Sequence, residues 1–125
     1  MTKGSGQDIM PLPEGKSTED LHDIIILGGG VAGLAAAITA GQLGLRVLVL
    51  EKAVLGGSVA VLDTVSGYPG VEDIGGWELT QTMVKQAEDI GCKLFDSIEV
   101  IDVQKTGNAA FALKSSDGKC FQARS

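Results

Sequence analysis

The fold is decided by residues 23–51, which read DIIILGGGVAGLAAAITAGQLGLRVLVLE. The unbroken apolar, β-branched run at 23–27 is typical of a strand buried on both faces. After three glycines, residues 31–44 carry apolar positions at helical spacing and end at Gly44, where a glycine is expected to stop a helix. Residues 46–51 predict a second apolar strand. Strand, helix and strand within about 30 residues predict a right-handed βαβ unit with parallel strands.

Gly28, Gly30 and Gly33 have the spacing GxGxxG between the first strand and the helix. Gly28 lets the backbone turn sharply, Gly30 lets a pyrophosphate approach the main chain, and Gly33 lets the helix pack closely on the strands. Unpaired N–H groups and the positive helix end would hold the phosphates without a lysine. The pattern predicts a dinucleotide-binding turn. The alternative is a tightly packed turn that binds nothing.

Glu51 ends the second strand about 20 positions after the first glycine, where an acidic residue accepts hydrogen bonds from ribose hydroxyls. A carboxylate there would repel a 2′-phosphate, which favours FAD or NAD over NADP. The alternative is a solvated acid at a strand end. Lys52 follows directly and is included in the candidate site.

The remaining sequence predicts one more helix and several short strands. Residues 53–76 form a long glycine-rich connection, and connections of this length are often functional. Residues 77–91 predict an amphipathic helix, and 93–104 predict one or two strands. Hairpin signals up to residue 124 predict a small antiparallel meander. The fold class is therefore α/β, a Rossmann-like βαβ unit with a parallel sheet plus an antiparallel meander near the C-terminus.

Composition limits the class of protein. The chain has 125 residues, is 44% hydrophobic and carries a net charge of -6. These values suit one globular domain and disfavour nucleic acid or anionic lipid as partners. No apolar stretch reaches about 18 residues, so no membrane span is expected. Residues 1–21 predict a flexible tail without a secretory signal, and 22–125 predict the domain.

The cysteines and the histidine offer no catalytic or metal-binding constellation. Cys92 and Cys120 form no CxxC pair and are interpreted as reduced, partly buried thiols of a cytoplasmic protein. His22 precedes the first strand and is interpreted as a surface residue at a strand edge. The sequence predicts no catalytic residue and no metal site.

Two further motifs make the pattern more specific: Gly56-Gly57, and Tyr68-Pro69-Gly70 ahead of a helix. Together with the glycine fingerprint and Glu51, and in this order, they resemble the FAD-binding part of thioredoxin reductases. These enzymes are flavoprotein disulfide reductases with two dinucleotide-binding domains. The resemblance covers residues 22–123 and implies FAD as the cofactor.

The resemblance also implies which residues line the cofactor. The glycine turn would face the pyrophosphate, the acid would hold the adenosine ribose, and the second glycine pair with its following residue would run toward the flavin. The candidate cofactor-binding residues are Gly28, Gly29, Gly30, Val31, Ala32, Gly33, Glu51, Lys52, Gly56, Gly57 and Ser58. The Gly56-Gly57 pair has an ordinary loop turn as its alternative, and Tyr68-Pro69-Gly70 is either a plain turn or a flavin-side wall. Trp77 is interpreted as a packing residue at a helix start, with a ligand contact as the alternative.

The chain departs from the family at two positions near the flavin. A glutamine usually follows the Gly-Gly pair, and an asparagine usually precedes the aromatic-Pro-Gly motif, whereas this chain has Ser58 and Gly67. Two hydrogen bonds to the flavin would be lost, while the pyrophosphate and ribose contacts would be kept.

Three hypotheses follow from segments of the family pattern that these 125 residues lack. The missing segments are the CxxC, the NADPH domain, the strand after the meander and the C-terminal return segment. The first hypothesis is the FAD-binding part of a thioredoxin reductase-like oxidoreductase, which passes electrons from a nicotinamide via FAD to a disulfide or another acceptor. The second is a non-catalytic FAD- or NAD-binding module, or a subunit of a split flavoenzyme. The third is a truncated product that binds nothing.

The first hypothesis implies that the chain alone does not turn over. NAD(P)H would bind only through a missing domain or a partner chain. The chain is expected to stop at Ser125 within a strand or just before one, leaving a sheet edge that a homo-oligomer or a partner chain would complete.

Overall fold

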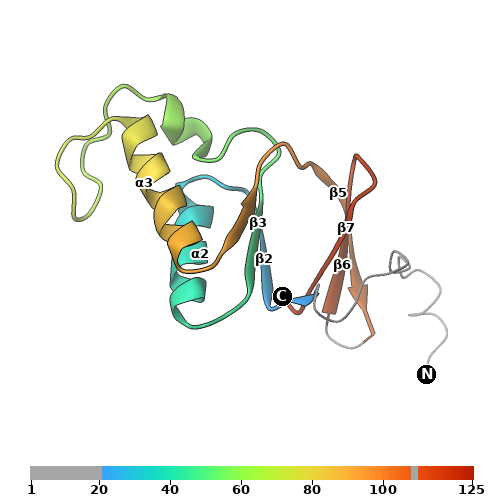
Figure 1. The fold of residues 1–125 in the computed structure, drawn as a ribbon. Helices are drawn as coiled ribbons and strands as arrows, with labels where there is room; N and C mark the ends of the chain where they lie inside the picture. Colours follow the sequence, from blue (N-terminus) through green and yellow to red (C-terminus); the bar gives the residue numbers. More distant parts are fainter. Residues whose placement is uncertain (1–20, 108–109) are drawn as a thin grey trace.

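The structure, a computed structural model, describes residues 21–107 and 110–125 (Figure 1). Its elements in chain order are β1 Leu21–His22, β2 Ile24–Leu27, α2 Val31–Gln42, β3 Val47–Leu50, the 3-10 helix η2 Gly57–Val61, α3 Gly76–Asp89, β4 Lys93–Phe95, β5 Val100–Thr106, β6 Ala110–Ser115 and β7 Cys120–Ala123.

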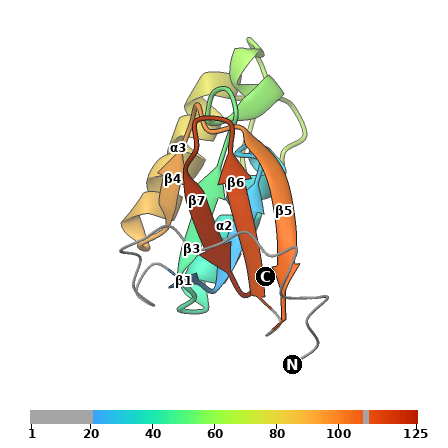
Figure 2. The same cartoon turned by 90° about the vertical axis from the view of Figure 1, so that its right-hand side faces the viewer.

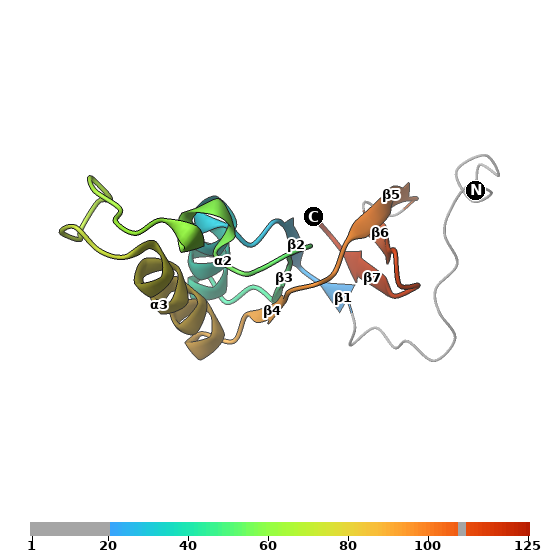
Figure 3. The same ribbon diagram turned by 90° about the horizontal axis from the view of Figure 1, so that it is seen from above.

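The elements form three layers, with helices α2 and α3 on one side, a parallel sheet in the middle and a second sheet on the other side (Figures 1 and 3). The middle sheet has the order β2-β3-β4. Ile24 lies opposite Val47 and Leu27 opposite Leu50 in parallel register. All of β3 is buried, as expected for a central strand covered on both faces. The predicted βαβ unit with a parallel sheet is confirmed.

The main core lies between the helices and the parallel sheet. Leu34 and Ala37 of α2, Val49 of β3 and Ala87 of α3 have no exposed surface. Burying a side chain the size of leucine stabilises a fold by about 1.5–3 kcal/mol. The small residues among them let α2 lie close to both the sheet and α3. A separate cluster around Leu48 of β3 joins the sheet to the meander on its other face.

Both helices end two residues before the glycines predicted to stop them, Gly44 and Gly91. After α2, Gly44 adopts φ +81°, and the N–H of Leu45 donates to the Ala40 carbonyl at 3.2 Å. After α3, Gly91 adopts φ +95°, and the N–H of Cys92 donates to the Ala87 carbonyl at 3.0 Å. These bonds satisfy carbonyl groups that a helix end leaves unpaired. The regular part of α2 therefore stops at Gln42, two residues before the predicted end.

The second sheet has the order β1-β7-β6-β5, and its β5-β6-β7 part is the predicted antiparallel meander (Figure 2). The sequence did not predict β1, which pairs in parallel with β7 and sets Leu21 opposite Gln122. The predicted tail is therefore one residue too long, because Leu21 belongs to a strand. The rest of that predicted tail, residues 1–20, lies outside the described part of the chain.

The end of β7 ties the two sheets together. The N–H of Arg124 donates to the His22 carbonyl at 3.0 Å, and the N–H of Ile25 in β2 donates to the Ser125 carbonyl at 2.9 Å. Asp23 lies in the chain between His22 and β2, and its carboxylate accepts the N–H of Arg46, just before β3, at 2.7 Å. The meander is thereby held against the start of the parallel sheet.

We expect Gly33→Ala to destabilise the fold, because its Cβ would lie 1.9 Å from the Gly28 carbonyl oxygen. Relieving such an overlap with backbone costs about 1–3 kcal/mol of unfolding free energy. The matched control is Gly30→Ser, since serine is a preferred N-cap and a Cβ at position 30 would meet no described atom within 4 Å. Urea unfolding followed by circular dichroism measures both variants. If Gly33→Ala has the same unfolding free energy as Gly30→Ser, the packing role of Gly33 is contradicted.

Candidate functional site

The glycine turn joins the carboxyl end of β2 to the first turn of α2. The N–H of Gly28 donates to the Leu50 carbonyl of β3 at 2.9 Å, and Gly28 adopts φ +109°, a conformation that favours glycine. The buried Gly29 follows, and Gly30 is the N-cap of α2 with extended backbone. The first helical turn consists of Val31, Ala32 and Gly33.

Two of these glycines lie in opposite surroundings. A Cβ on Gly33 would overlap the Gly28 carbonyl oxygen, so the close approach of α2 to the end of β2 requires glycine. A Cβ on Gly30 would meet no described atom within 4 Å, so the backbone there faces open space. The first finding confirms the packing role predicted for the third glycine. The second leaves room for a ligand against bare main chain, as predicted for Gly30.

The start of α2 is suited to an anion. Among the described residues, no side chain caps this helix, and its first turn contains no acidic residue. The first N–H groups of a helix lack partners within the helix, and the helix dipole places partial positive charge beside them. With the open space at Gly30, these groups form a cradle that a phosphate group fits.

Glu51 lies directly after β3 and reaches back to the glycine turn. Its Oε2 accepts the N–H of Gly29 at 2.8 Å, and its Oε1 accepts the N–H of Ala53 at 3.0 Å. The carboxylate thus fastens the turn to the chain that leaves β3, a role the sequence did not predict. Each carboxylate oxygen has a second acceptor position, so hydrogen bonds from ribose hydroxyls remain compatible with this geometry.

The pKa of the Glu51 carboxyl is held below its ordinary value. Partial burial alone would raise this pKa, but hydrogen bonds from the backbone N–H groups of Ala53, Gly29 and Lys52, and the charge of Lys52, outweigh it. The side chain is therefore a carboxylate at neutral pH, which is the form that accepts hydrogen bonds without donating any.

A pocket of about 470 Å³ opens beside the turn. Its walls come from the ends of β2 and β3, the residues that directly follow them, and the segment that leads from β4 into the start of β5. They are Leu27, Gly28, Leu50, Glu51, Lys52, Ile98, Glu99 and Val100. The N–H of Ile98 donates to the Glu51 carbonyl at 2.9 Å, which fixes this segment to the end of β3. Open α/β sheets bind ligands outside the carboxyl ends of their strands, where this pocket lies. The pocket combines apolar side chains such as Leu27 and Ile98 with the charged side chains of Glu51 and Lys52, a lining that suits an aromatic base joined to a sugar.

Sequence reasoning missed the contribution of residues 98–100 to this pocket. The reason lies in the pairing of the strands, because β4 is a third parallel strand and the carboxyl ends of parallel strands lie at one edge of a sheet. The residues that follow β4 therefore leave the sheet at the same edge as the glycine turn.

Gly56 and Gly57 pack directly on the glycine turn. The N–H of Gly56 donates to the Gly29 carbonyl at 2.7 Å, and Gly30 and Gly56 form an isolated parallel bridge. A Cβ on Gly56 would lie 2.7 Å from Oγ1 of Thr80, and one on Gly57 would lie 3.1 Å from the Gly30 Cα. Close packing therefore requires glycine at position 56, and a side chain at position 57 would crowd the Gly30 backbone; both residues also adopt positive φ, which favours glycine. Ser58, the next residue, is exposed on η2.

Lys52, which follows Glu51 in the chain, is exposed and lines the pocket. The structure thus brings the glycine turn, Glu51, Lys52 and the Gly56-Gly57 pair together at one edge of the sheet, with Ser58 next in the chain. Their contact with a cofactor stays a prediction.

The interpretation of Trp77 as a packing residue was wrong. Trp77 is 58% exposed at the second position of α3. Gly76 holds the buried position instead, because a Cβ there would lie 1.9 Å from the Val59 carbonyl oxygen. Tyr68 packs on α3, with its hydroxyl 3.8 Å from Sδ of Met83.

The cysteines do not form a redox pair. Both are thiols; Cys92 is buried with its Sγ 3.3 Å from the Ala37 carbonyl, and Cys120 is half-buried on β7. Burial raises the pKa of the Cys92 thiol, which disfavours the reactive thiolate. Within residues 21–107 and 110–125, no cluster of His, Cys, Asp and Glu side chains could hold a metal ion. Across the same residues, none of the helices has the length and apolar character needed to cross a bilayer.

We expect Glu51→Gln to reduce the unfolding free energy by about 1 kcal/mol at pH 7, because one charge-assisted hydrogen bond is lost. Since folding lowers the pKa of Glu51, its stabilisation is present above the ordinary value of 4.5 and is lost as the pH falls through the folded value. The difference in unfolding free energy between wild type and variant should therefore narrow as the pH falls below 4.5. Urea unfolding at a series of pH values checks this. Glu88→Gln, an exposed α3 position, controls for the lost charge, and a gap independent of pH would refute the assigned role.

Comparison with known proteins connects this geometry to a family. Residues 22–124 match the family described as pyridine nucleotide-disulphide oxidoreductase. The thioredoxin reductase of Bacillus subtilis is 39% identical over 88 residues, which cover 69% of this chain and 28% of the relative. The thioredoxin reductase of Listeria innocua is 33% identical over 110 residues, which cover 86% of this chain and 33% of the relative.

A solved structure agrees with these relatives. The thioredoxin reductase of T. acidophilum superimposes with a TM-score of 0.75 at 31% identity, over 84% of this chain and 34% of that one. This chain spans about a third or less of the relatives it matches. It belongs to the pyridine nucleotide-disulphide oxidoreductase family and is similar to the FAD-dependent thioredoxin reductases within it, which confirms both the resemblance and the cofactor predicted from the sequence.

Proposed function

We propose that residues 22–125 are the FAD-binding part of a thioredoxin reductase-like oxidoreductase that passes electrons from a nicotinamide via FAD to a disulfide or another acceptor. One observation carries this proposal: the uncapped start of α2 faces open space at Gly30, beside a pocket of about 470 Å³ at the carboxyl edge of the sheet. An anionic diphosphate joined to an adenosine suits these two adjoining features.

Each part of the cofactor would meet a different part of the site. The pyrophosphate would rest on the N–H groups at the start of α2, and the adenine would enter the pocket walled by Leu27 and Ile98. Glu51 would accept hydrogen bonds from the ribose while still holding Gly29. The Gly56-Gly57 pair, which packs on the turn, would line the path toward the flavin. When bound, FAD supplies the electron-transfer chemistry, and the protein orients it and excludes water.

The flavin end of the site would bind less firmly than in relatives with the two amide side chains. Ser58 is exposed and carries only a short hydroxyl, and Gly67 adopts φ +76° in an exposed loop. We propose that affinity for FAD comes mainly from the adenosine diphosphate half, where the backbone donors and Glu51 lie.

The remaining parts of the reaction would come from outside this sequence. Since this chain covers only 28% to 33% of the relatives' length, we propose that NAD(P)H and the electron acceptor bind to a further segment or to a partner chain. The isolated chain should then bind FAD without oxidising NAD(P)H. We also propose a cytoplasmic location, which the thiol state of both cysteines supports.

We expect Gly30→Asp to abolish FAD binding while the fold is kept. Aspartate is a favoured N-cap, so the helix should form, but its carboxylate would fill the cradle and repel the pyrophosphate. Affinity should fall at least about a hundredfold, which corresponds to roughly 2.7 kcal/mol. Quenching of flavin fluorescence during titration measures the affinity, and circular dichroism checks the fold.

Gly107→Asp is the matched control, because it adds the same charge at a position where a Cβ would meet no described atom within 4 Å. Its FAD affinity should equal that of the wild type. Unchanged affinity in Gly30→Asp would reject the pyrophosphate position.

We expect ADP to compete with FAD, and FMN to compete at least about tenfold less well, a difference of roughly 1.4 kcal/mol. ADP contains the base, ribose and diphosphate that this site is proposed to hold, whereas FMN contains only the flavin end with one phosphate. Displacement of bound FAD by each nucleotide is measured by recovery of flavin fluorescence. Stronger competition by FMN would place most of the affinity at the flavin end.

A further inference from the structure

One corner of the molecule exposes large apolar side chains. It is formed by η2 and the start of α3, where Val61 is 82% exposed, Leu62 49% and Trp77 58%. The two segments are in direct contact, since the N–H of Gly76 donates to the Leu62 carbonyl at 2.9 Å. We call Val61, Leu62 and Trp77 the η2–α3 corner. Soluble proteins rarely leave clustered apolar side chains exposed unless the surface binds something.

The exposure of Trp77 follows from the packing of its neighbour. Gly76 lies so close to the Val59 and Leu62 carbonyls that no side chain fits there, so η2 presses on α3 through bare backbone. The indole ring one residue later is left on the outside. Tryptophan is the side chain that interfaces favour most at their energetic centres.

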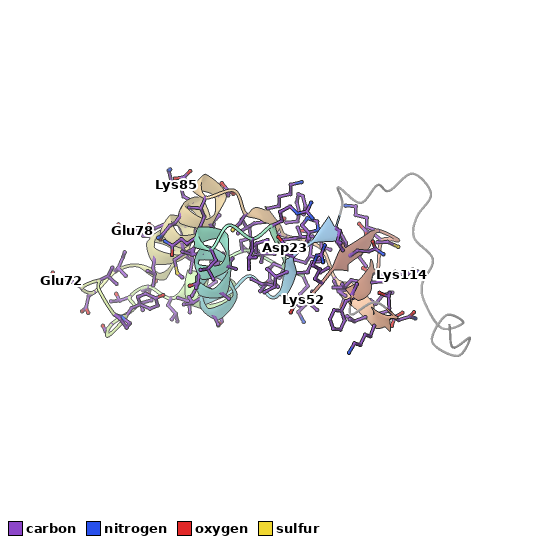
Figure 4. All side chains as sticks on the ribbon, turned by 90° about the horizontal axis from the view of Figure 1, so that it is seen from below. Asp23, Lys52, Glu72, Glu78, Lys85 and Lys114 are labelled. Carbon is purple, nitrogen blue, oxygen red and sulfur yellow. The ribbon has the colours of Figure 1, made fainter. Side chains whose placement is uncertain are left out.

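The charged side chains in the segment that contains the η2–α3 corner are all negative. Residues 53–84 contain the acids Asp63, Glu72, Asp73 and Glu78, and no lysine, arginine or histidine. Asp63 directly follows Leu62, and Glu78 directly follows Trp77, so both acids border the apolar side chains. The next basic residue along the chain, Lys85, forms an ion pair with Asp89 at 2.6 Å. Glu72 and Glu78 lie on the helix side of the molecule and Lys114 on the opposite, meander side (Figure 4).

We propose that the η2–α3 corner is a docking surface for a partner protein that presents an apolar pocket flanked by lysine or arginine side chains. The charge of the corner argues for this occupant. A second copy docking through the same surface would bring acids against acids, which opposes association. A basic partner would instead be attracted at long range, and Trp77 would be buried at the centre of the contact.

Trp77 is the single tryptophan of the chain, so its fluorescence reports on this corner alone. The probe is a synthetic helical peptide with leucine on one face and lysine on the other, and a peptide with glutamate in place of lysine is its control. We expect the leucine–lysine peptide to shift the emission of Trp77 to shorter wavelength saturably, with affinity falling at high salt. The glutamate peptide should cause no shift.

Variants separate docking at the corner from general attraction to an acidic protein. Asp63→Asn combined with Glu78→Gln should weaken peptide binding about tenfold. Glu88→Gln combined with Asp102→Asn removes the same charge elsewhere and should leave binding unchanged. Val61→Ser with Leu62→Ser should also weaken binding about tenfold. Since these side chains are exposed, the melting temperature should stay at the wild-type value, which shows that folding is kept.

Four results would overturn the proposal. The first is that the leucine–lysine peptide does not shift the Trp77 emission of the wild type, and the second is that both charge variants lose peptide affinity equally. The third is an emission shift that grows with protein concentration in the absence of peptide, and the fourth is that FAD alone causes the full emission shift. The third would assign the corner to a second copy and the fourth to the flavin. The titrations are run with and without FAD, so failure of the chain to bind FAD leaves the peptide result readable.

Discussion

The close approach of α2 to the end of β2 is the constraint on which the rest of the structure depends. At Gly33 the helix backbone lies so near the Gly28 carbonyl that any side chain would separate them. Because the helix begins there, its N-terminus faces the edge where β3 also ends. Glu51 then reaches Gly29, and Gly56 bonds to the Gly29 carbonyl. A shift of the helix would break both connections, so the cradle and the loop that lines it exist only in this packing.

The sequence predicted the parts of the fold whose signals are local. The apolar run at 23–27, the glycine spacing and the stops at Gly44 and Gly91 are readable within a few residues, and a strand and two helix ends were found there. The prediction that this strand is buried on both faces was wrong, because β2 is an edge strand of the parallel sheet and is only half-buried, with Leu27 52% exposed. The position of Glu51 was readable because a βαβ unit has a nearly constant length. The resemblance to a known family added Gly56 and Gly57, which the structure packs against the turn.

What the sequence left unpredicted depends on contacts between distant segments. The pairing of Leu21 with Gln122 and the place of Ile98 in the pocket wall follow from register across the sheets, which spacing along the chain does not encode. Trp77 shows a different limit. Its place at the start of α3 suggested a packing residue, but Gly76 makes the close backbone contact there and leaves Trp77 58% exposed.

A site built from backbone donors leaves the surrounding side chains free to serve other purposes. The cradle at the start of α2 attracts an anion through N–H groups and the helix dipole, so it needs no lysine or arginine. The chain can therefore carry a net charge of -6 and still suit a diphosphate. It also carries acids as the only charged residues along 53–84, beside the exposed apolar side chains. Recognition of a nucleotide by main chain and recognition of a partner by side chains are thus compatible within a single small domain.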